Sequence, residues 1–220
     1  MSFLQRELRI LEILKNNQCH VIPAIQYPTK NPTCIIMPAL HNFKEGKKHT
    51  KLKAQYIIQQ VATHIKCLLD QKLYYTDIKL QNTLYNCNKQ QQIDIYLTDL
   101  GAAEKDEDKN NCVWTYSLPK TQDWSTKNNT WEKHKQEVMK KYGPNYIYAA
   151  IVFQLLVMYE QLLTGTYERI LPDHYQNSDN FTFTQRDDNN PYDIFNMTVE
   201  AFFEIDPKQT DWKNWITTLS

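Results

Sequence analysis

Residues 75–82 of the chain read Tyr-Thr-Asp-Ile-Lys-Leu-Gln-Asn, and residues 98–101 read Thr-Asp-Leu-Gly. Four of these side chains carry the chemistry: Asp77, Lys79, Asn82 and Asp99. A carboxylate can orient an attacking hydroxyl, and a lysine can meet a transferring phosphate. An amide and a second carboxylate can hold Mg²⁺. The spacing is therefore the polar layout that a phosphoryl-transfer site needs.

The apolar pattern around these stretches predicts a series of helices and strands. In the first half of the chain we expect a helix at 3–15, strands at 21–25 and 34–37, an exposed connector at 43–50, an amphipathic helix at 51–73 and a hairpin from 84–85 and 93–97. In the second half we expect a polar loop at 104–130, a buried helix at 146–163, a loop at 171–192 and helical structure around Asp206-Pro207 near the end. Gly165 follows the buried helix where a capping glycine is expected.

This order of elements, with the two polar motifs between the long helix and the buried helix, resembles the eukaryotic-type protein kinases from their first helix onward. The resemblance covers most of the chain and is most specific at 75–101. It implies an α+β fold with a mainly α-helical large lobe at 41–220, which carries a catalytic loop at 75–82 and the Asp-Leu-Gly motif at 99–101. The small lobe, residues 1–40, is then incomplete and consists of one helix, two strands and a hinge.

The resemblance also implies roles for the polar residues. Asp77 is similar to the catalytic base, which accepts the proton of a Ser or Thr hydroxyl. Lys79 would lie against the γ-phosphate of ATP, and Asn82 and Asp99 would ligate Mg²⁺. Gly101 would allow the tight backbone turn of the metal-binding loop.

Residues that contact the nucleotide are implied in the same way. Met37 is similar in position to the gatekeeper, Pro38 and Leu40 to the hinge, and Leu84 to the residue beneath the adenine. Glu7 resembles the glutamate of the regulatory helix. Each has an ordinary alternative: a plain buried edge strand that ends at Pro38, a core position for Leu84, and a solvated glutamate on an amphipathic helix for Glu7.

Several features depart from the family pattern. The chain has only 4 glycines and they are widely separated, so no glycine-rich phosphate loop is expected. Only six residues precede Glu7, which leaves no room for the strand whose lysine normally pairs with this glutamate. Thr76, Lys120 and Asn145 stand where the family usually has Arg, Glu and Asp.

Two functions remain open at this stage. The first is ATP- and Mg²⁺-dependent phosphoryl transfer to Ser or Thr of proteins, provided that a longer parent chain or a partner supplies the missing small-lobe elements. The alternative is a catalytically impaired pseudokinase that acts as a protein-interaction module or kinase decoy. Either function implies a protein substrate or a partner protein, possibly another kinase.

Composition and cysteine usage give the remaining expectations. Lys+Arg and Asp+Glu both number 25, so the net charge predicts neither a nucleic acid nor a membrane as partner. The 5 cysteines are scattered without metal-binding spacing and are expected to be reduced thiols. The first residues lack an apolar leader, which favours a cytoplasmic or nuclear location over secretion. The three Asn-x-Thr matches, at Asn128, Asn180 and Asn196, then carry little weight.

Overall fold

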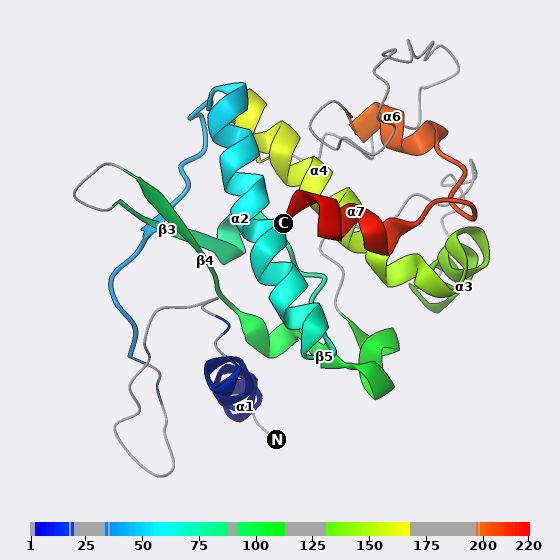
Figure 1. Cartoon of the computed structure of the whole chain (residues 1–220), viewed down its shortest axis with the longest axis horizontal. Helices are drawn as coiled ribbons and strands as arrows, with labels where there is room; N and C mark the ends of the chain where they lie inside the picture. The colour runs from blue at the N-terminus through cyan, green and yellow to red at the C-terminus, as the bar shows by residue number, and fades with distance from the viewer. Residues whose placement is uncertain are drawn as a thin grey trace.

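The computed structural model is an α+β arrangement of helices and two small antiparallel sheets (Figure 1). It describes residues 3–17, 19, 34, 36–87, 92–112, 131–167, 197 and 199–220. The helices are α1 (Phe3–Asn16), α2 (Lys51–Asp70), α3 (Trp131–Tyr142), α4 (Tyr146–Thr164), α6 (Val199–Glu204) and α7 (Trp212–Leu219). The strands are β1 (His41–Asn42), β2 (Leu73–Tyr74), β3 (Thr83–Cys87), β4 (Ile93–Leu97) and β5 (Glu104–Lys105). Short 3₁₀ turns connect them: η1 (Leu80–Asn82), η2 (Leu100–Ala102), η3 (Asp106–Asn111) and η4 (Gly143–Asn145).

Three helices form the centre of the core. Helix α2 buries one apolar face, whereas α4 is apolar nearly all round and is buried along most of its length. Helix α7 lies across both (Figure 1). It contributes the fully buried rings of Trp212 and Trp215. Burying one large apolar side chain contributes about 1.5–3 kcal/mol, so these faces supply the main driving force for folding. The core thereby fixes the loop that follows α2.

The two sheets lie at the two ends of that loop. The larger sheet has the order β1-β3-β4, with His41 opposite Tyr85 and Thr83 opposite Leu97. The smaller sheet pairs β2 with β5, and Tyr74 lies opposite Glu104. Residues 75–82 therefore leave one sheet and enter the other.

The outer edge of β4 is covered by side chains of α2. Gln60 Nε2 donates to the Ile93 carbonyl at 2.8 Å, and Gln60 Oε1 accepts from the Ile95 amide at 3.0 Å. His64 Nε2 lies 2.8 Å from the Ile95 carbonyl oxygen. One amide side chain thus replaces the backbone of a neighbouring strand and satisfies groups that an open edge would leave exposed.

Most of the expected elements are confirmed, and three expectations are corrected. The segment Cys34 to Met37 was expected to be a strand, but among its described residues, Cys34, Ile36 and Met37, only Ile36 forms a bridge, and all three are exposed. Of the loop expected at 104–130, residues 104–111 form β5 and η3 instead, because β5 pairs with β2, and residues 113–130 lie outside the described residues. The connector 43–50 is exposed except at Phe43, which is buried, and at His49. The expected strand at 21–25 and the loop at 171–192 lie outside the described residues.

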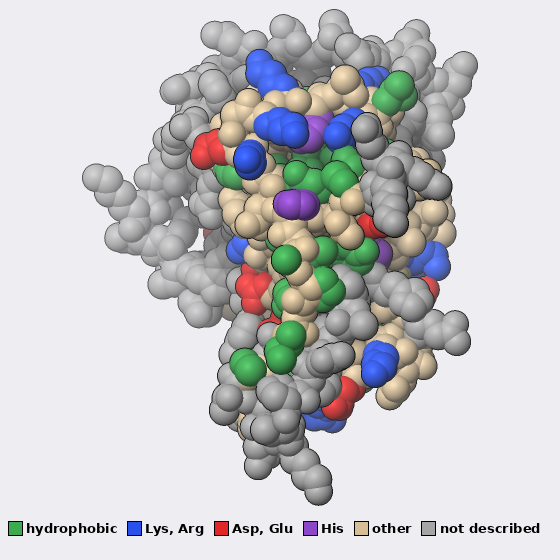
Figure 2. Space-filling model, turned by 90° about the vertical axis from the view of Figure 1, so that its left-hand side faces the viewer, with side chains coloured by type: hydrophobic (Ala, Val, Ile, Leu, Met, Phe, Trp, Pro, Cys, Tyr) green, Lys and Arg blue, Asp and Glu red, His purple; other side chains and the backbone are tan. Residues whose placement is uncertain are grey.

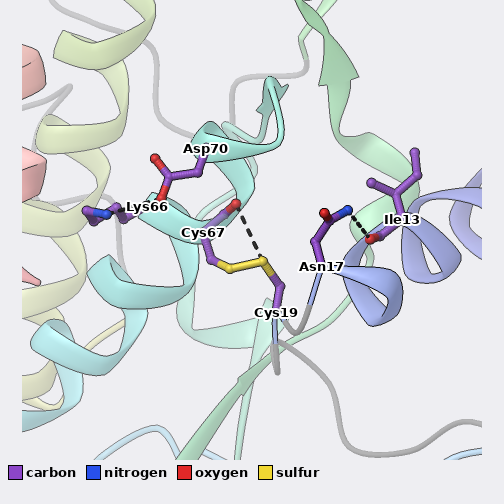
Figure 3. Close-up of a disulfide and its surroundings, with 6 residues drawn as sticks. All are labelled: Ile13, Asn17, Cys19, Lys66, Cys67 and Asp70. Carbon is purple, nitrogen blue, oxygen red and sulfur yellow. Dashed lines mark hydrogen bonds and ion pairs between the residues drawn. A yellow bond between two sulfur atoms is a disulfide. The ribbon is translucent and has the colours of Figure 1, made fainter.

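The prediction that all cysteines are reduced thiols is wrong for two of them. Cys19 and Cys67 form a disulfide between the end of α1 and the last turns of α2 (Figure 3). Asn17 Nδ2 donates to the Ile13 carbonyl at 2.8 Å as α1 ends, and the chain then turns toward α2. The two Cα atoms are 6.0 Å apart, within the range that a disulfide spans. The pairing joins positions 48 residues apart, so spacing along the sequence did not reveal it.

One helical segment of the described chain, Lys135–Thr164, is long and apolar enough by composition to cross a membrane. Its apolar window is 78% buried inside the protein. A mostly buried core helix passes the same test, so this segment is weak evidence for a membrane span.

Candidate functional site

The loop 75–82 is anchored by its own side chains, several of which are buried in the core. The side chains of Tyr75, Ile78 and Leu80 are buried and alternate with the polar residues of the motif. Thr76 is fully buried, and Asp77 is only 6% exposed. Both apolar and polar side chains of the loop are therefore buried, and the folded core fixes their positions.

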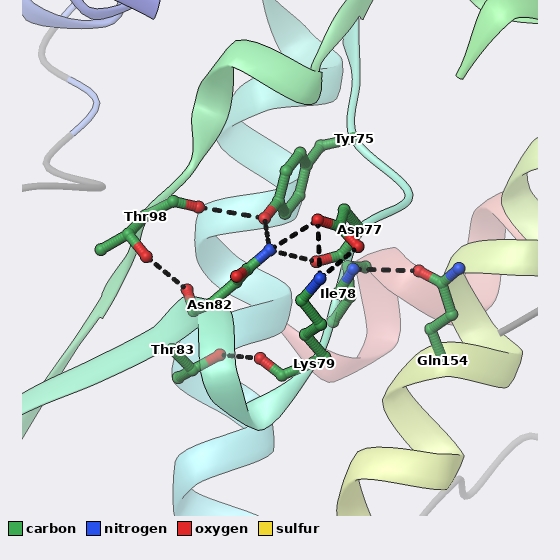
Figure 4. Close-up of polar contacts among 8 residues, drawn as sticks. All are labelled: Tyr75, Asp77, Ile78, Lys79, Asn82, Thr83, Thr98 and Gln154. Atoms are coloured by element: carbon green, nitrogen blue, oxygen red, sulfur yellow. Dashed lines mark hydrogen bonds and ion pairs between the residues drawn. The ribbon is translucent and has the colours of Figure 1, made fainter. Parts of the chain in front are cut away.

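Asp77 is the centre of the polar cluster (Figure 4). Lys79 Nζ donates to both of its carboxylate oxygens, at 2.9 and 3.0 Å. Asn82 Nδ2 donates to Asp77 Oδ2 at 2.7 Å. Three of the four predicted site residues are therefore within hydrogen-bond distance of one another, and the Asp77 charge is matched by that of Lys79.

The hydrogen bonds of Asn82 all use its amide nitrogen. Besides Asp77 Oδ2, Nδ2 reaches the Asp77 carbonyl and the Tyr75 hydroxyl oxygen, each at 3.1 Å. Three acceptors thus share two protons. The orientation of the amide that this network selects leaves Oδ1 as the atom of Asn82 able to ligate a cation.

The hydroxyl of Tyr75 links the first motif to the second. It donates to the Thr98 carbonyl at 3.0 Å while it accepts from Asn82 (Figure 4). Burial, followed by the nearby Asp77 carboxylate, raises the pKa of Tyr75 well above its usual value, so the hydroxyl remains a donor. The Thr98 amide also donates to the Asn82 carbonyl at 2.9 Å. These bonds fix residue 98, and through it Asp99, beside Asn82.

Asp99 itself takes the unusual backbone conformation of this turn. Its φ of 59° and ψ of 39° lie in the left-handed region, which Asp and Asn tolerate better than most residues. The expectation that Gly101 supplies the turn is thus corrected: among the described residues, the positive-φ glycines are Gly46, Gly143 and Gly165. Gly101 is instead buried within η2.

Helix α1 packs directly on this turn. Glu7 is partly buried and accepts a hydrogen bond from the Leu100 backbone amide. Burial raises the pKa of Glu7, and the negative charge of Asp99 raises it further. The neighbouring Arg6 donates to the Ala103 carbonyl at 2.8 Å and forms an ion pair with Glu104. The carboxylate of the regulatory-helix candidate therefore lies close enough to that of the metal-site candidate for the two charges to repel each other.

One supporting residue was missed in the sequence. Gln154, in the middle of α4, is fully buried, and its Oε1 accepts from the Ile78 amide at 3.2 Å (Figure 4). An amide inside a run of apolar residues was a usable signal, because a buried polar side chain requires a partner. Here it ties the central helix to the loop between Asp77 and Lys79.

Of the nucleotide-contact candidates, Leu84 lies in strand β3, whereas Met37, Pro38 and Leu40 lie in the segment before β1. Met37 and Pro38 are exposed, and Leu40 is partly exposed just before β1. Strand β1 pairs with β3, which places Asn42 opposite Leu84. The candidate hinge thus runs into the strand beside the one that carries Leu84.

The three departures from the family pattern have different structural settings. Thr76 is buried beside Cys112, with which its side chain forms a hydrogen bond. Asn145 lies at the start of α4 and is exposed. Lys120 falls outside the described residues.

The oxygen donors suit a hard cation. Asp99 contributes a carboxylate and Asn82 an amide oxygen, the ligand types that Mg²⁺ prefers. Within the described ranges, no three His, Cys, Asp or Glu side chains are grouped to hold a metal ion unaided. A Mg²⁺ ion here would need further oxygens from phosphate and water, which is its usual manner of binding beside nucleotides.

No protein-family model matches this chain, and no curated protein matches it either.

Proposed function

We propose that this chain is a protein-kinase-like domain whose site binds ATP with Mg²⁺ for phosphoryl transfer to Ser or Thr of a protein. The observation that carries the proposal is the cluster of Asp77, Lys79 and Asn82, joined through Tyr75 to the residue before Asp99. Residues 1–40 would be the small-lobe part and 41–220 the large lobe. The glycine-rich loop and the lysine of the small lobe would come from a longer parent chain or from a partner.

Each polar side chain has a defined task in this proposal. Asp77 accepts the hydroxyl proton of the substrate. The Lys79 ammonium group turns from Asp77 toward the transferring phosphate and contacts it there. Asn82 Oδ1 and the Asp99 carboxylate hold Mg²⁺, which neutralises charge on the phosphate oxygens. Met37, Pro38, Leu40 and Leu84 would surround the adenine. We place this activity in the cytoplasm or nucleus.

The electrostatic repulsion between Glu7 and Asp99 favours a second candidate function. In the family, the regulatory-helix glutamate pairs with a lysine, but in this chain it faces another carboxylate and its pKa is raised. The lysine that normally pairs with this glutamate is a preorganised donor to the phosphates, and losing such a donor commonly lowers the rate by about 10²–10³. The alternative is therefore a catalytically impaired pseudokinase that acts on a partner protein, including another kinase, by binding alone.

Calorimetric titration with ATP, with and without Mg²⁺, tests the nucleotide site. We expect binding that requires Mg²⁺ and that falls at least about tenfold in Asp99→Asn, because one anionic ligand is lost. Asparagine is the chosen replacement because it tolerates the left-handed backbone at this position. Asp108→Asn is the matched control, because Asp108 is exposed in η3 and the substitution removes the same negative charge.

Two outcomes would contradict the assignment. Equal Mg²⁺-dependent binding in the wild type and Asp99→Asn would exclude Asp99 as a ligand. No binding of ATP at millimolar concentration would remove the catalytic proposal and leave the pseudokinase. For a chain supplied with the missing elements, Asp77→Asn should retain ATP binding and lower the transfer rate by about 10²–10⁴.

A further inference from the structure

A cluster of lysines occupies the connector before α2 and the first turn of that helix. It comprises Lys44, Lys47, Lys48, Lys51 and Lys53, which we call the lysine cluster. Glu45 is the one acidic residue between positions 44 and 53. Figure 2 shows basic side chains gathered across the upper part of one face of the molecule. The zero net charge of the chain hides this local excess of positive charge.

The connector is held in place by the end of α4. The Gly46 amide donates to the Gly165 carbonyl at 2.7 Å, and the His49 amide donates to the Leu162 carbonyl at 2.8 Å. Gly165 fits closely, because a Cβ there would lie 3.1 Å from the backbone carbonyl carbons of Gly46 and Lys47. Fixing the backbone in advance means that less conformational entropy is lost when the lysines bind a ligand.

Phe43 anchors the other end of the connector. Its ring is buried and packs against Tyr85, with ring centroids 5.0 Å apart. The Phe43 carbonyl accepts a hydrogen bond from the Tyr167 hydroxyl. The lysine cluster is thus attached to the core at both of its flanks.

The positive charge of the cluster is not neutralised internally. Across the residues that the structure describes, the ion pairs involve Arg6, Lys66, Lys79, Lys105 and Lys109, and none involves a lysine of the cluster. Burial lowers the pKa of His49, and the charges of Lys53 and Lys47 lower it further. The surface therefore presents uncompensated positive charge to solvent.

Two exposed apolar side chains border the lysine cluster. Leu52 is 80% exposed and Tyr56 is 45% exposed, one turn apart on the same face of α2. Further along that face Gln59 and Thr63 are exposed and polar, so the apolar part is confined to the end beside the lysines. A leucine exposed to this degree protrudes from the surface instead of lining a groove.

We propose that the lysine cluster, together with Leu52 and Tyr56, binds the surface of a membrane that contains anionic phospholipids. The lysines would contact phosphate and carboxylate groups of the lipids, and Leu52 and Tyr56 would enter the interfacial region. This proposal departs from the expectation, drawn from net charge alone, that no membrane is a partner. It does not depend on the proposed nucleotide site.

The shape and composition of the surface favour a bilayer over two other kinds of partner. An apolar peptide segment needs a concave surface, whereas Leu52 projects outward. Nucleic-acid sites characteristically use arginine for bidentate contacts, whereas all five cations of the cluster are lysine. Protruding apolar residues surrounded by lysine are typical of interfacial membrane contacts.

Sedimentation of the full chain with phosphatidylcholine vesicles, with and without phosphatidylserine, tests the proposal. We expect binding only when phosphatidylserine is present, and weaker binding as salt is raised. The double variant Lys47→Glu/Lys48→Glu should reduce binding by more than about tenfold. The double variant Lys208→Glu/Lys213→Glu is the matched control, because it changes the charge equally at exposed sites near the C-terminus.

Leu52→Ser separates a membrane from other polyanions. It should weaken sedimentation with the vesicles and leave binding to labelled single-stranded RNA unchanged, because serine removes the apolar contact but no charge. Thermal unfolding checks that each variant is folded. Equal binding by the wild type and the 47/48 variant, no effect of Leu52→Ser, or binding to RNA without binding to vesicles would each overturn the proposal.

Discussion

Glu7 of α1 and Asp99, the residue before η2, bring two carboxylates close together, and their repulsion makes the stability of the protein depend on pH. Because burial and Asp99 raise the pKa of Glu7, the folded state binds a proton at this site more readily than the unfolded state does. The free energy of unfolding therefore falls as the pH rises from about 4.5, the usual value, through the raised pKa. Above the raised pKa this contribution is constant and unfavourable.

Replacing Glu7→Gln should remove that unfavourable contribution. The glutamine retains an oxygen acceptor for the Leu100 amide but carries no charge. We expect Glu7→Gln to be more stable than the wild type at neutral pH, by at most about 1 kcal/mol because water screens the partly exposed pair. The difference should disappear in acid, where Glu7 of the wild type is protonated in both states.

Denaturant unfolding of both proteins from acid to neutral pH measures this effect. Glu12→Gln is the control on the same helix, because Glu12 is exposed, and its effect should stay within about 0.5 kcal/mol. A Glu7→Gln variant that is less stable than the wild type at neutral pH would mean that the charge of Glu7 is stabilising.

Among the elements, α2 covers the edge of β4 with Gln60 and His64, and the two hydrogen bonds of Gln60 give a second prediction. Gln60→Ala removes the partners of the Ile93 carbonyl and the Ile95 amide together. We expect a loss of about 1–3 kcal/mol in the free energy of unfolding, the usual cost of leaving a buried polar group unsatisfied. Gln59→Ala is the matched control, since Gln59 is the exposed neighbour on the same helix and should change stability by less than about 0.5 kcal/mol.

Denaturant unfolding of the two alanine variants under identical conditions makes the comparison. Equal losses would contradict a specific role of Gln60 at the edge of β4, because alanine itself favours the helix and Gln59 makes no such contact. A larger loss at position 59 would contradict the role given to Gln60.

The elements that the sequence predicted share a simple property. Helices α1 and α2 and the β3–β4 hairpin each contain their own apolar period, and α4 is a continuous apolar run, so local reading detects all of them. The two-residue strands β1, β2 and β5 have no period of their own and exist because distant segments meet. Helix α3 was missed because its described turns are mostly polar.

The same distinction applies at the candidate site. Asp77, Lys79 and Asn82 lie in one short loop, so their spacing along the sequence was enough to predict that their side chains would come together. The bond from Tyr75 to Thr98, and the approach of Glu7 to Asp99, depend on how separate elements pack. The left-handed turn was assigned to Gly101 on residue type, whereas the backbone uses Asp99.

At the scale of the whole molecule, the Cys19–Cys67 disulfide adds one covalent link to the chain, and counting free thiols tests whether that link is present. The chain has 5 cysteines, of which Cys34, Cys87 and Cys112 are free. We expect three thiols in denatured, unreduced protein and five after reduction. In folded protein Cys34 and Cys87 should react quickly, because they are exposed, whereas burial raises the pKa of Cys112 to about 11 and slows its reaction.

Loss of this bridge should be costly. The cysteines are 48 residues apart, and closing a loop of that size stabilises a protein by about 2–4 kcal/mol. Cys19→Ser should therefore unfold at lower denaturant concentration than Cys34→Ser, and reductant should remove the difference. Five thiols before reduction would contradict the disulfide and would accord with the proposed cytoplasmic or nuclear location, where thiols remain reduced.

The bridge also determines what a protease can separate. A peptide-bond cut at any single position between Cys19 and Cys67 leaves two pieces that remain joined through sulfur. Without reductant such a nicked protein retains its full mass, and α1 stays attached beside η2. With reductant the piece that carries α1 can dissociate, and Asp99 then loses the neighbouring carboxylate of Glu7. Nicking followed by reduction would thus free the candidate metal site of α1 without changing any residue of it.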